Sequence, residues 1–280
     1  VTVSCGEAGG ASGVSTAARP YMLRRLGVVM RPRVGDPLEA GGVLNPGGAR
    51  GRDGAYYLFP RIVAEGNFSR IGLAKVVYNA AGEPCDVERL GVALTPEAPY
   101  ELNHISGGGC EDPRITFIEP LDRYVMTYTA FSSRGPRIAL AASRDLFHWE
   151  RLGLATFKPY EGLSFNDIDN KDGVFFPVAI PDPDGRPAMA LIHRPLFPGT
   201  GPDEKLHCRF SRERDARRES IWISYNSLSK GCCDSRVCRH LCHFDSHRQL
   251  ATPLAPWEQL KVGAGTPPIL TREGWLFLYH

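Results

Sequence analysis

Apolar and polar residues alternate over several short stretches of the chain, and a turn residue precedes each stretch. Four of them place aromatic and aliphatic side chains at strand spacing: residues 53–61, 122–130, 185–194 and 273–280. Because alternate residues of a strand point to opposite faces of a sheet, each stretch predicts a β-strand. The 30 glycines and 23 prolines are dispersed between apolar runs, which predicts many turns and excludes most long helices.

The first three predicted strands are each followed by a second one, so the pattern repeats as strand pairs. The second strands begin near residues 69, 136 and 219, roughly 70–80 residues apart. Antiparallel units that recur in this way favour a β-propeller over a β-sandwich. We expect an N-terminal segment (1–41) and an all-β propeller domain (42–280). The fourth pair stops at its first strand, so we interpret the sequence as lacking part of the last blade.

Composition and charge exclude several classes of protein. The 280 residues carry 33 basic and 31 acidic side chains, and a net charge of +2 gives no general attraction for nucleic acid or an anionic membrane. No stretch approaches the ~18 apolar residues of a membrane-spanning helix. The first twenty residues lack the layout of a secretory signal. We therefore expect a cytoplasmic location and reduced thiols.

The segment GGGCEDPRITFIEP (107–120) contains the most informative polar residues. Its glycines let the backbone approach a ligand closely, and they precede Glu111, Asp112 and Arg114. Two adjacent carboxyl groups beside an arginine can differ in pKa, so that one stays ionised while the other acts as an acid. The alternative is a salt-bridged turn that caps a strand.

Other loops contribute amide and basic side chains. Asn45 lies in LNPGGAR, and asparagine and arginine suit sugar hydroxyls because they offer hydrogen-bond donors in fixed geometry. The loops of a propeller gather around one mouth, so scattered basic residues can converge there into a pocket for an anion. These residues are Arg137, Lys171, His193, Arg194 and His280. Alternatively, each is paired separately on the surface.

In chain order, the segments NPGGAR, YYLFPR, SRIGLA, GGCEDPRIT, NKDGVFFP, HRP and GTPPILTREGWLFLYH resemble glycoside hydrolase family 130. This is the family of β-mannoside phosphorylases and related hydrolases. The resemblance covers roughly residues 42–280, and CEDPRIT and GTPPILTREGWLFLYH are its most specific pieces. It implies a five-bladed β-propeller whose central pocket binds a terminal β-linked mannose.

The resemblance also implies roles for individual residues. Asp112 corresponds to the family's general acid, which protonates the glycosidic oxygen through a sugar hydroxyl. Asn45, Arg61, Glu111 and Arg114 fall at positions that contact mannose. The phosphate site is expected at Arg137, Lys171, His193, Arg194 and His280. The implied reaction is inverting phosphorolysis to α-mannose 1-phosphate, with inorganic phosphate as co-substrate and with no cofactor or metal.

Three other interpretations stay open at this point. The chain could hydrolyse β-mannosides, although retention of Lys171 and of the His193–Arg194 pair favours phosphorolysis. It could be a carbohydrate-binding propeller without activity. A Cys- and Arg-rich insertion near residues 205–250 could bind structural zinc, because Cys238, Cys242, His243 and His247 have spacings that zinc tolerates. Loops set the linkage and the acceptor sugar, so neither is predicted. The resemblance allows a homo-oligomer.

Overall fold

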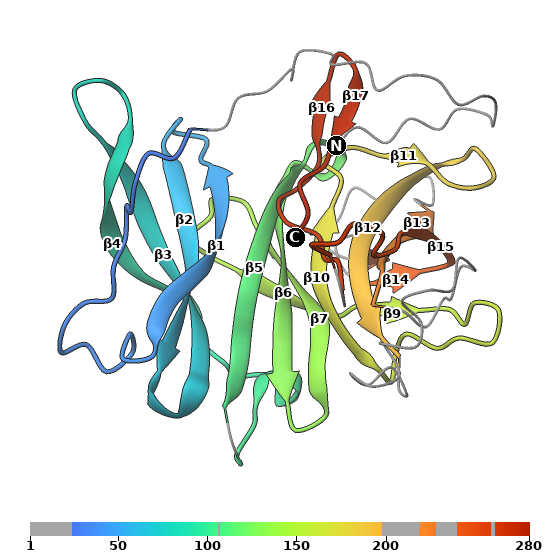
Figure 1. The fold of residues 1–280 in the computed structure, drawn as a ribbon, viewed down its shortest axis with the longest axis horizontal. Coiled ribbons are helices and arrows are strands. Elements are labelled where there is room, and N and C mark those ends of the chain that lie inside the picture. Colours follow the sequence, from blue (N-terminus) through green and yellow to red (C-terminus); the bar gives the residue numbers. More distant parts are fainter. Residues whose placement is uncertain (1–23, 106, 198–218, 228–239, 259–260) are drawn as a thin grey trace.

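The computed structural model describes residues 24–105, 107–197, 219–227, 240–258 and 261–280. These residues form antiparallel β-sheets that stand side by side as blades (Figure 1). The expected all-β propeller is confirmed. No described helix has the length and apolar character that crossing a lipid bilayer would take.

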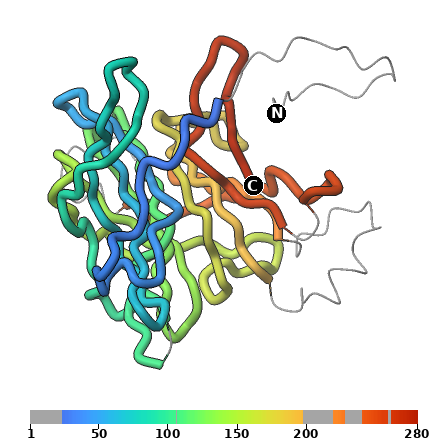
Figure 2. Tube along the Cα trace, turned by 60° about the vertical axis from the view of Figure 1, so that its left-hand side comes forward, coloured from blue at the N-terminus to red at the C-terminus, as the bar shows by residue number. Residues whose placement is uncertain are grey.

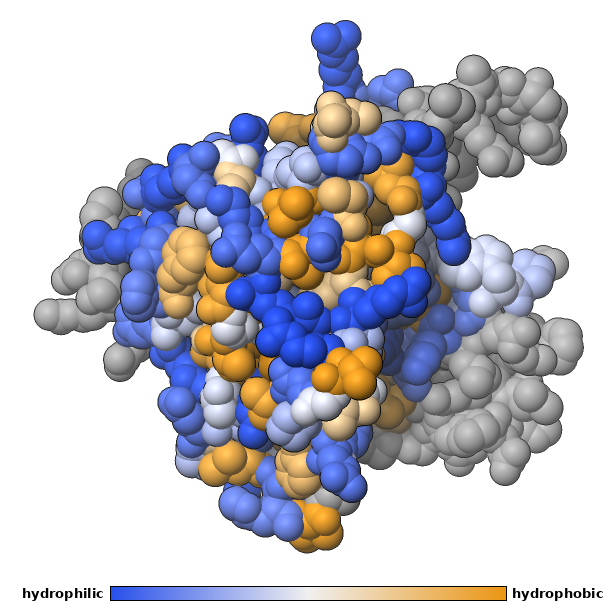
Figure 3. Space-filling model, turned by 90° about the vertical axis from the view of Figure 1, so that its left-hand side faces the viewer, coloured by the Kyte–Doolittle hydropathy of each residue, from blue (hydrophilic) through white to orange (hydrophobic). Residues whose placement is uncertain are grey.

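The first blade has four strands in chain order, each paired with the next. They are β1 (Gly42–Arg50), β2 (Tyr56–Ala64), β3 (Phe68–Tyr78) and β4 (Pro84–Leu94). The outermost strand, β4, leaves apolar side chains of this blade partly exposed, among them Val77 and Val92. On this side of the molecule, hydrophobic residues are interspersed with hydrophilic ones (Figure 3).

The second and third blades repeat this arrangement. The second consists of β5 (Gly108–Ile118), β6 (Arg123–Ser132), β7 (Gly135–Ser143) and β8 (Glu150–Leu154). A short parallel pairing between β3 and β5 joins the first two blades into one sheet. The third blade consists of β10 (Asp169–Phe175), β12 (Pro187–Leu196), β13 (Ile221–Ser227) and β15 (Ser246–Ala251).

Shorter elements connect or follow the blades. β11 (Ile180–Pro181) pairs with β12, β9 (Thr156–Phe157) pairs with β14 (His243–Phe244), and β16 (Ile269–Thr271) forms a hairpin with β17 (Gly274–Leu276). Single 3-10 turns occur at η1 (Glu65–Asn67), η2 (Pro99–Glu101) and η3 (Glu119–Leu121).

The strands predicted from alternation overlap the second strand of each blade, namely β2, β6 and β12, and then β17. Of the predicted N-terminal segment, residues 24–41 run along the first blade (Figure 2), where Glu39 is buried and ion-paired with Arg89 at 2.8 Å. Most of the predicted insertion near residues 205–250 lies outside the described residues, including Cys232, Cys233 and Cys238. Two strands of the third blade fall within this range, β13 in its middle and β15 at its end.

The core lies between the facing sheets. One cluster of buried side chains, including Phe59 and Met126, fills the space between the first and second blades. A second cluster, including Leu140 and Trp222, fills the space between the second and third blades. A third packs the last blade described against the C-terminal hairpin, with Trp275 at its edge. Burial of these apolar faces holds the blades together and fixes the innermost strands against one another.

Candidate active site

Each blade's innermost strand changes register at one point, and a residue with left-handed backbone lies there. These residues are Asn45 in β1 (φ 43°), Asp112 in β5 (φ 49°) and Asp172 in β10 (φ 57°). Asparagine and aspartate tolerate this conformation better than other non-glycine residues. A bulge of this kind re-aims a side chain that regular alternation would point elsewhere. The same bulge with a left-handed residue therefore occurs in the innermost strand of each of the three described blades.

Asp112 is held from the first blade. Its Oδ1 accepts hydrogen bonds from Nδ2 of Asn45 at 2.9 Å and from Nη1 of Arg61 at 3.3 Å. The close approach of β1 to β5 depends on Gly47, because a Cβ at that position would lie 2.7 Å from the carbonyl oxygen of Pro113. The Asp112 side chain keeps 18% of its surface exposed, so it is accessible from solvent.

Glu111 lies beside Asp112 but is almost completely buried, with 2% of its side chain exposed. Its Oε1 accepts a hydrogen bond from Nη2 of Arg61 at 2.8 Å, and its Oε2 lies 3.6 Å from Nζ of Lys171. Burial raises the pKa of Glu111 above its ordinary value, although the charges of Arg61 and Lys171 oppose this shift. The two adjacent carboxyl groups thus have different surroundings.

Lys171 brings a positive charge from the third blade to this group. Its ammonium lies 5.7 Å from the ring centre of Phe131, within the range of a cation–π contact, and 31% of the side chain is exposed. We call Asn45, Arg61, Glu111, Asp112 and Lys171 the Asp112 cluster.

A second group of charges adjoins it around Asp172. Both carboxylate oxygens of Asp172 are paired, Oδ1 with Arg114 at 2.9 Å and Oδ2 with Arg194 at 2.7 Å. Arg194 also contacts Glu219 at 2.8 Å. Burial would raise the pKa of Asp172, but the two arginines outweigh it and hold the pKa below its ordinary value. We call Asp172, Arg114, Arg194 and Glu219 the Asp172 cluster.

Arg114 connects the two clusters and the C-terminal segment. Its guanidinium donates to the carbonyl oxygens of Asp112 at 3.1 Å and of Ala264 and Gly265 at 2.8 Å each. A side chain at Gly263 would lie 2.3 Å from Oδ2 of Asp172, so only glycine lets this segment pass. Arg114 is predicted to contact mannose, but these hydrogen bonds of its guanidinium group are made to the protein backbone.

The structure brings most of the predicted site residues together. Five form the Asp112 cluster, Arg114 and Arg194 belong to the Asp172 cluster, and His280 lies at its edge, 3.9 Å from Asp172 and 62% exposed. Arg137 is paired with Asp169, two residues before Lys171, at 3.2 Å. The roles of these residues in binding and catalysis stay predictions.

His193 is the exception, and its place as a phosphate ligand is corrected by the structure. Its ring is completely buried and stacks on Phe157 with ring centres 4.7 Å apart. Its nitrogens lie within hydrogen-bond distance of Asn170 and Ser224. The cause is the strand period, since His193 and Arg194 are consecutive in β12 and point to opposite faces.

Asp172 was missed by sequence analysis, although it lies in the quoted segment NKDG. The signal that identifies it is its position in the repeat, because it occupies the place in the third blade that Asp112 occupies in the second.

Burial of two histidines predicts acid sensitivity of the fold. Burial lowers the pKa of His193 well below its ordinary value and also lowers that of His247. Both gain protons more readily when unfolded, so their stabilising contribution is present above about pH 6.5 and is lost as the pH falls below it. We expect the free energy of unfolding in urea to decrease from pH 7.5 to 5.5.

The control for this measurement is His148→Gln, which changes an exposed imidazole and should leave the decrease intact. A free energy of unfolding that stays constant over this window would contradict the prediction. The window lies above the ordinary carboxyl pKa values of about 4, and Glu111, whose pKa is raised by burial, would act in the opposite direction.

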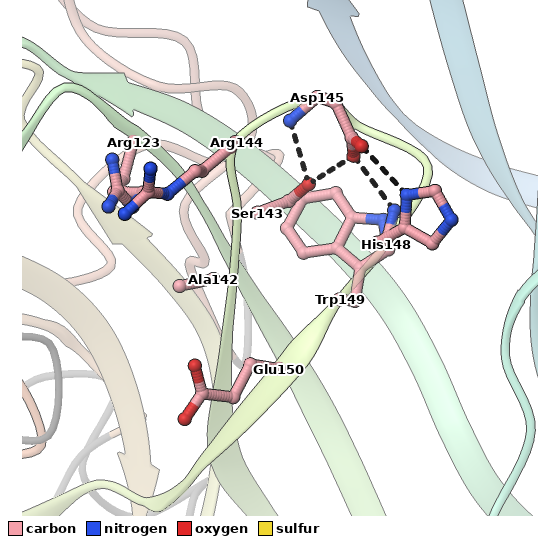
Figure 4. Close-up of a pocket in the computed structure, with 8 residues that line it drawn as sticks. All are labelled: Arg123, Ala142, Ser143, Arg144, Asp145, His148, Trp149 and Glu150. Atoms are coloured by element: carbon pink, nitrogen blue, oxygen red, sulfur yellow. Dashed lines mark hydrogen bonds and ion pairs between the residues drawn. The ribbon is translucent and has the colours of Figure 1, made fainter. Parts of the chain in front are cut away.

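A cavity of about 390 Å³ lies at the other end of the second blade (Figure 4). It is lined by Arg123, Ala142, Ser143, Arg144, Asp145, His148, Trp149 and Glu150. Polar side chains of the loop 143–148 are hydrogen-bonded within that loop, since Ser143 and Asp145 accept hydrogen bonds from its backbone N–H groups. Arg123 begins β6, whereas Glu111 pairs with Thr129 near the end of that strand. The cavity is therefore separate from the Asp112 cluster.

The zinc interpretation gains no support from the described part of the chain, where no three His, Cys, Asp or Glu side chains gather as metal ligands would. Cys238 lies outside it, His243 contacts Thr156 and His247 contacts Ser224.

In sequence, the chain is similar to a family model and to individual proteins. A family model described as β-1,4-mannooligosaccharide phosphorylase, glycoside hydrolase family 130, matches residues 70–213. A 1,2-β-oligomannan phosphorylase of Thermoanaerobacter is 27% identical over 90% of this chain and 68% of its own length. A β-1,4-mannooligosaccharide phosphorylase of Ruminococcus albus is 29% identical over 60% of this chain and 37% of its own length. The chain thus spans little more than a third of the second relative.

Solved structures show the same fold. The β-1,2-mannobiose phosphorylase of Listeria innocua, in complex with β-1,2-mannobiose, superposes with a TM-score of 0.60 at 22% identity, over 89% of this chain and 72% of the other. A structure reported for glycoside hydrolases of family 130 that target β-1,2 mannosidic linkages in Candida mannan gives a TM-score of 0.56 at 21% identity, over 92% and 71%. Because the family model matches half of the chain and the fold agrees, this chain belongs to glycoside hydrolase family 130.

Proposed function

We propose that the protein cleaves β-linked mannosides by phosphorolysis with inversion and releases α-mannose 1-phosphate. One observation carries the proposal. A carboxyl group oriented by amide and guanidinium donors, Asp112, and an ammonium group, Lys171, lie on the two sides of the buried Glu111. The carboxyl group of Asp112 suits an acid beside a sugar, and the ammonium group of Lys171 suits a phosphate anion. The relatives named as mannoside phosphorylases support the same reaction.

On the sugar side, Asp112 supplies a proton. Because Asn45 and Arg61 both donate to Oδ1, the proton in this mechanism is carried by Oδ2. As the bond between the anomeric carbon and the glycosidic oxygen breaks, the proton passes to that oxygen, through a sugar hydroxyl as the family resemblance implies. The leaving sugar thereby departs as a neutral alcohol, which lowers the barrier.

On the phosphate side, an oxygen of inorganic phosphate forms the new bond to the anomeric carbon from the opposite face. Phosphate is already a nucleophile and needs no base, but it needs cations to hold and orient it. Lys171 is the partly exposed cation of the Asp112 cluster, and His280 lies exposed beside the neighbouring Asp172. Hydrolysis would instead require a base for water, whereas Glu111 is already bound between two cations.

The substitution Lys171→Ala tests the phosphate site. A charge-assisted hydrogen bond contributes about 1.5–3 kcal/mol, so we expect the KM for phosphate to rise roughly ten- to hundredfold. The KM for the mannoside should change little, because the sugar contacts lie on the side of Asn45. The measurement is the initial rate of α-mannose 1-phosphate release as the phosphate concentration is varied.

The control is Lys75→Ala, which removes a lysine from β3 in the first blade. Arsenate should replace phosphate and give mannose as the final product, since its shape and charge are the same. Activity that is independent of phosphate and unaffected by Lys171→Ala would contradict the proposal and favour hydrolysis. The cytoplasmic location and the homo-oligomer stay predictions.

A further inference from the structure

Four buried polar side chains lie end to end in the third blade, one from each of its four strands. They are Asn170 of β10, His193 of β12, Ser224 of β13 and His247 of β15, each at most 2% exposed. His193 lies 3.1 Å from Asn170 through Nδ1 and 2.7 Å from Ser224 through Nε2. The hydroxyl of Ser224 lies 2.8 Å from Nδ1 of His247. We call these four residues the blade-three chain.

The blade-three chain ends on the backbone, where Nε2 of His247 lies 3.0 Å from the carbonyl oxygen of Lys158. The rings of Phe157 and Phe165 pack against His193, so its surroundings are apolar. Burial lowers the pKa of both histidines, and each is therefore neutral, with one N–H donor and one acceptor nitrogen.

This end point fixes the direction of every hydrogen bond. A carbonyl oxygen only accepts, so Nε2 of His247 carries the hydrogen and its Nδ1 is an acceptor. The hydroxyl of Ser224 must then donate to His247. With that hydrogen used, the oxygen of Ser224 accepts from Nε2 of His193, which leaves Nδ1 of His193 as an acceptor.

Asn170 completes the chain only in one orientation. Its Oδ1 faces Nδ1 of His193, which would bring two acceptors together, while its Nδ2 is buried and has no hydrogen-bond partner among the described residues. Exchanging the amide oxygen and nitrogen turns the contact into a hydrogen bond from Nδ2 to Nδ1. The chain then runs in a single direction from Asn170 to the backbone of Lys158.

We propose that the blade-three chain positions Lys171, so that His193 acts on phosphate binding through Asn170 rather than as a ligand. This inference rests on the proposed function. Strand β10 loses its backbone partner just beyond Lys171, because its register with β12 shifts between Lys171 and Val174, and Pro195, opposite Asn170, has no N–H to donate. Lys171 lies between Asn170, held by His193, and Asp172, held by Arg114 and Arg194. Both neighbours of Lys171 in sequence are thus anchored by side chains.

The substitution Ser224→Ala interrupts the chain at its centre and leaves Nε2 of His193 without its acceptor. We expect the KM for phosphate to rise about five- to tenfold and the KM for the mannoside to stay within about twofold. A merely structural loss would lower the fraction of active protein and so kcat, without changing the KM for phosphate. The matched control is Ser220→Ala, which removes a buried serine hydroxyl immediately before β13, bonded to Gln249 and outside the chain.

A second measurement tests the direction of the chain in the wild-type protein and does not depend on activity. ¹⁵N NMR of histidine-labelled protein at pH 7.5 should show His193 and His247 as neutral rings protonated at Nε2, with each signal assigned by its loss in His193→Gln or His247→Gln. Protonation of His193 at Nδ1 would overturn the assigned direction.

The outcomes separate this inference from the proposed function. If wild-type activity depends on phosphate and Ser224→Ala has the same KM for phosphate as Ser220→Ala, the positioning role is overturned and the proposed function stands. Wild-type activity that does not depend on phosphate overturns the proposed function and the positioning role with it. A selective rise in the KM for phosphate, together with the Nε2–H forms, supports both.

Discussion

Asp112→Asn should lower kcat for phosphorolysis by about 10²–10⁴-fold, the usual contribution of a general acid. The change keeps the shape of the side chain, and the amide oxygen can still accept the hydrogen bonds from Asn45 and Arg61 at Oδ1. Asparagine also tolerates the left-handed backbone at this position, where φ is 49°. Only the proton is lost, so the KM values and the thermal unfolding midpoint should stay close to those of the wild type.

The matched control is Asp122→Asn. Asp122 has the same φ of 49° and is also paired with an arginine, Arg52 at 2.6 Å, but it is exposed at the other end of the second blade. A substrate whose leaving group is already a weak base, such as a nitrophenyl mannoside, needs little protonation and should lose much less activity. Asp112→Asn with kcat within about twofold of the wild type would exclude Asp112 as the acid.

The second and third strands of each blade could be predicted from the sequence, whereas the innermost strands could not. β2, β6 and β12 alternate or are continuously apolar behind a turn signal, and this pattern predicts a strand. β1 and β5 contain NPGG and GGCEDP, which have the composition of turns. The bulges require that composition, because they need left-handed residues and close backbone contacts in the middle of a strand. The residues that form the site therefore give its strands the composition of turns, and for this reason these strands were not predicted.

The same geometry explains which site residues could be predicted. Adjacent residues of a regular strand point to opposite faces, so His193 and Arg194 cannot both face the mouth. Glu111 and Asp112 are adjacent too, but the bulge in β5 turns both toward Arg61. Sequence alone gave no way to distinguish the regular strand β12 from the bulged strand β5. It also gave no sign that Arg114 would bind backbone carbonyls about 150 residues away, a contact that needs the tertiary fold.

Asp172→Asn should destabilise the fold by about 3–5 kcal/mol, measured as the free energy of unfolding in urea at pH 7, because it removes the shared counter-charge of two largely buried guanidinium groups. Arg114 and Arg194 come from different blades, so the loss weakens the contact between the second and third blades. Asparagine retains the left-handed backbone at φ 57°, which isolates the effect of charge.

The control is Asp169→Asn. Asp169 is 42% exposed and is paired with Arg137, so this substitution should cost less than about 1 kcal/mol. The pKa of Asp172 is lowered in the folded protein, so its contribution is present above about pH 4 and is lost as the pH falls below that value. The variant should accordingly lose less stability than the wild type between pH 4 and pH 3. Equal free energies of unfolding for Asp172→Asn and Asp169→Asn would show that the Asp172 cluster does not hold the blades together.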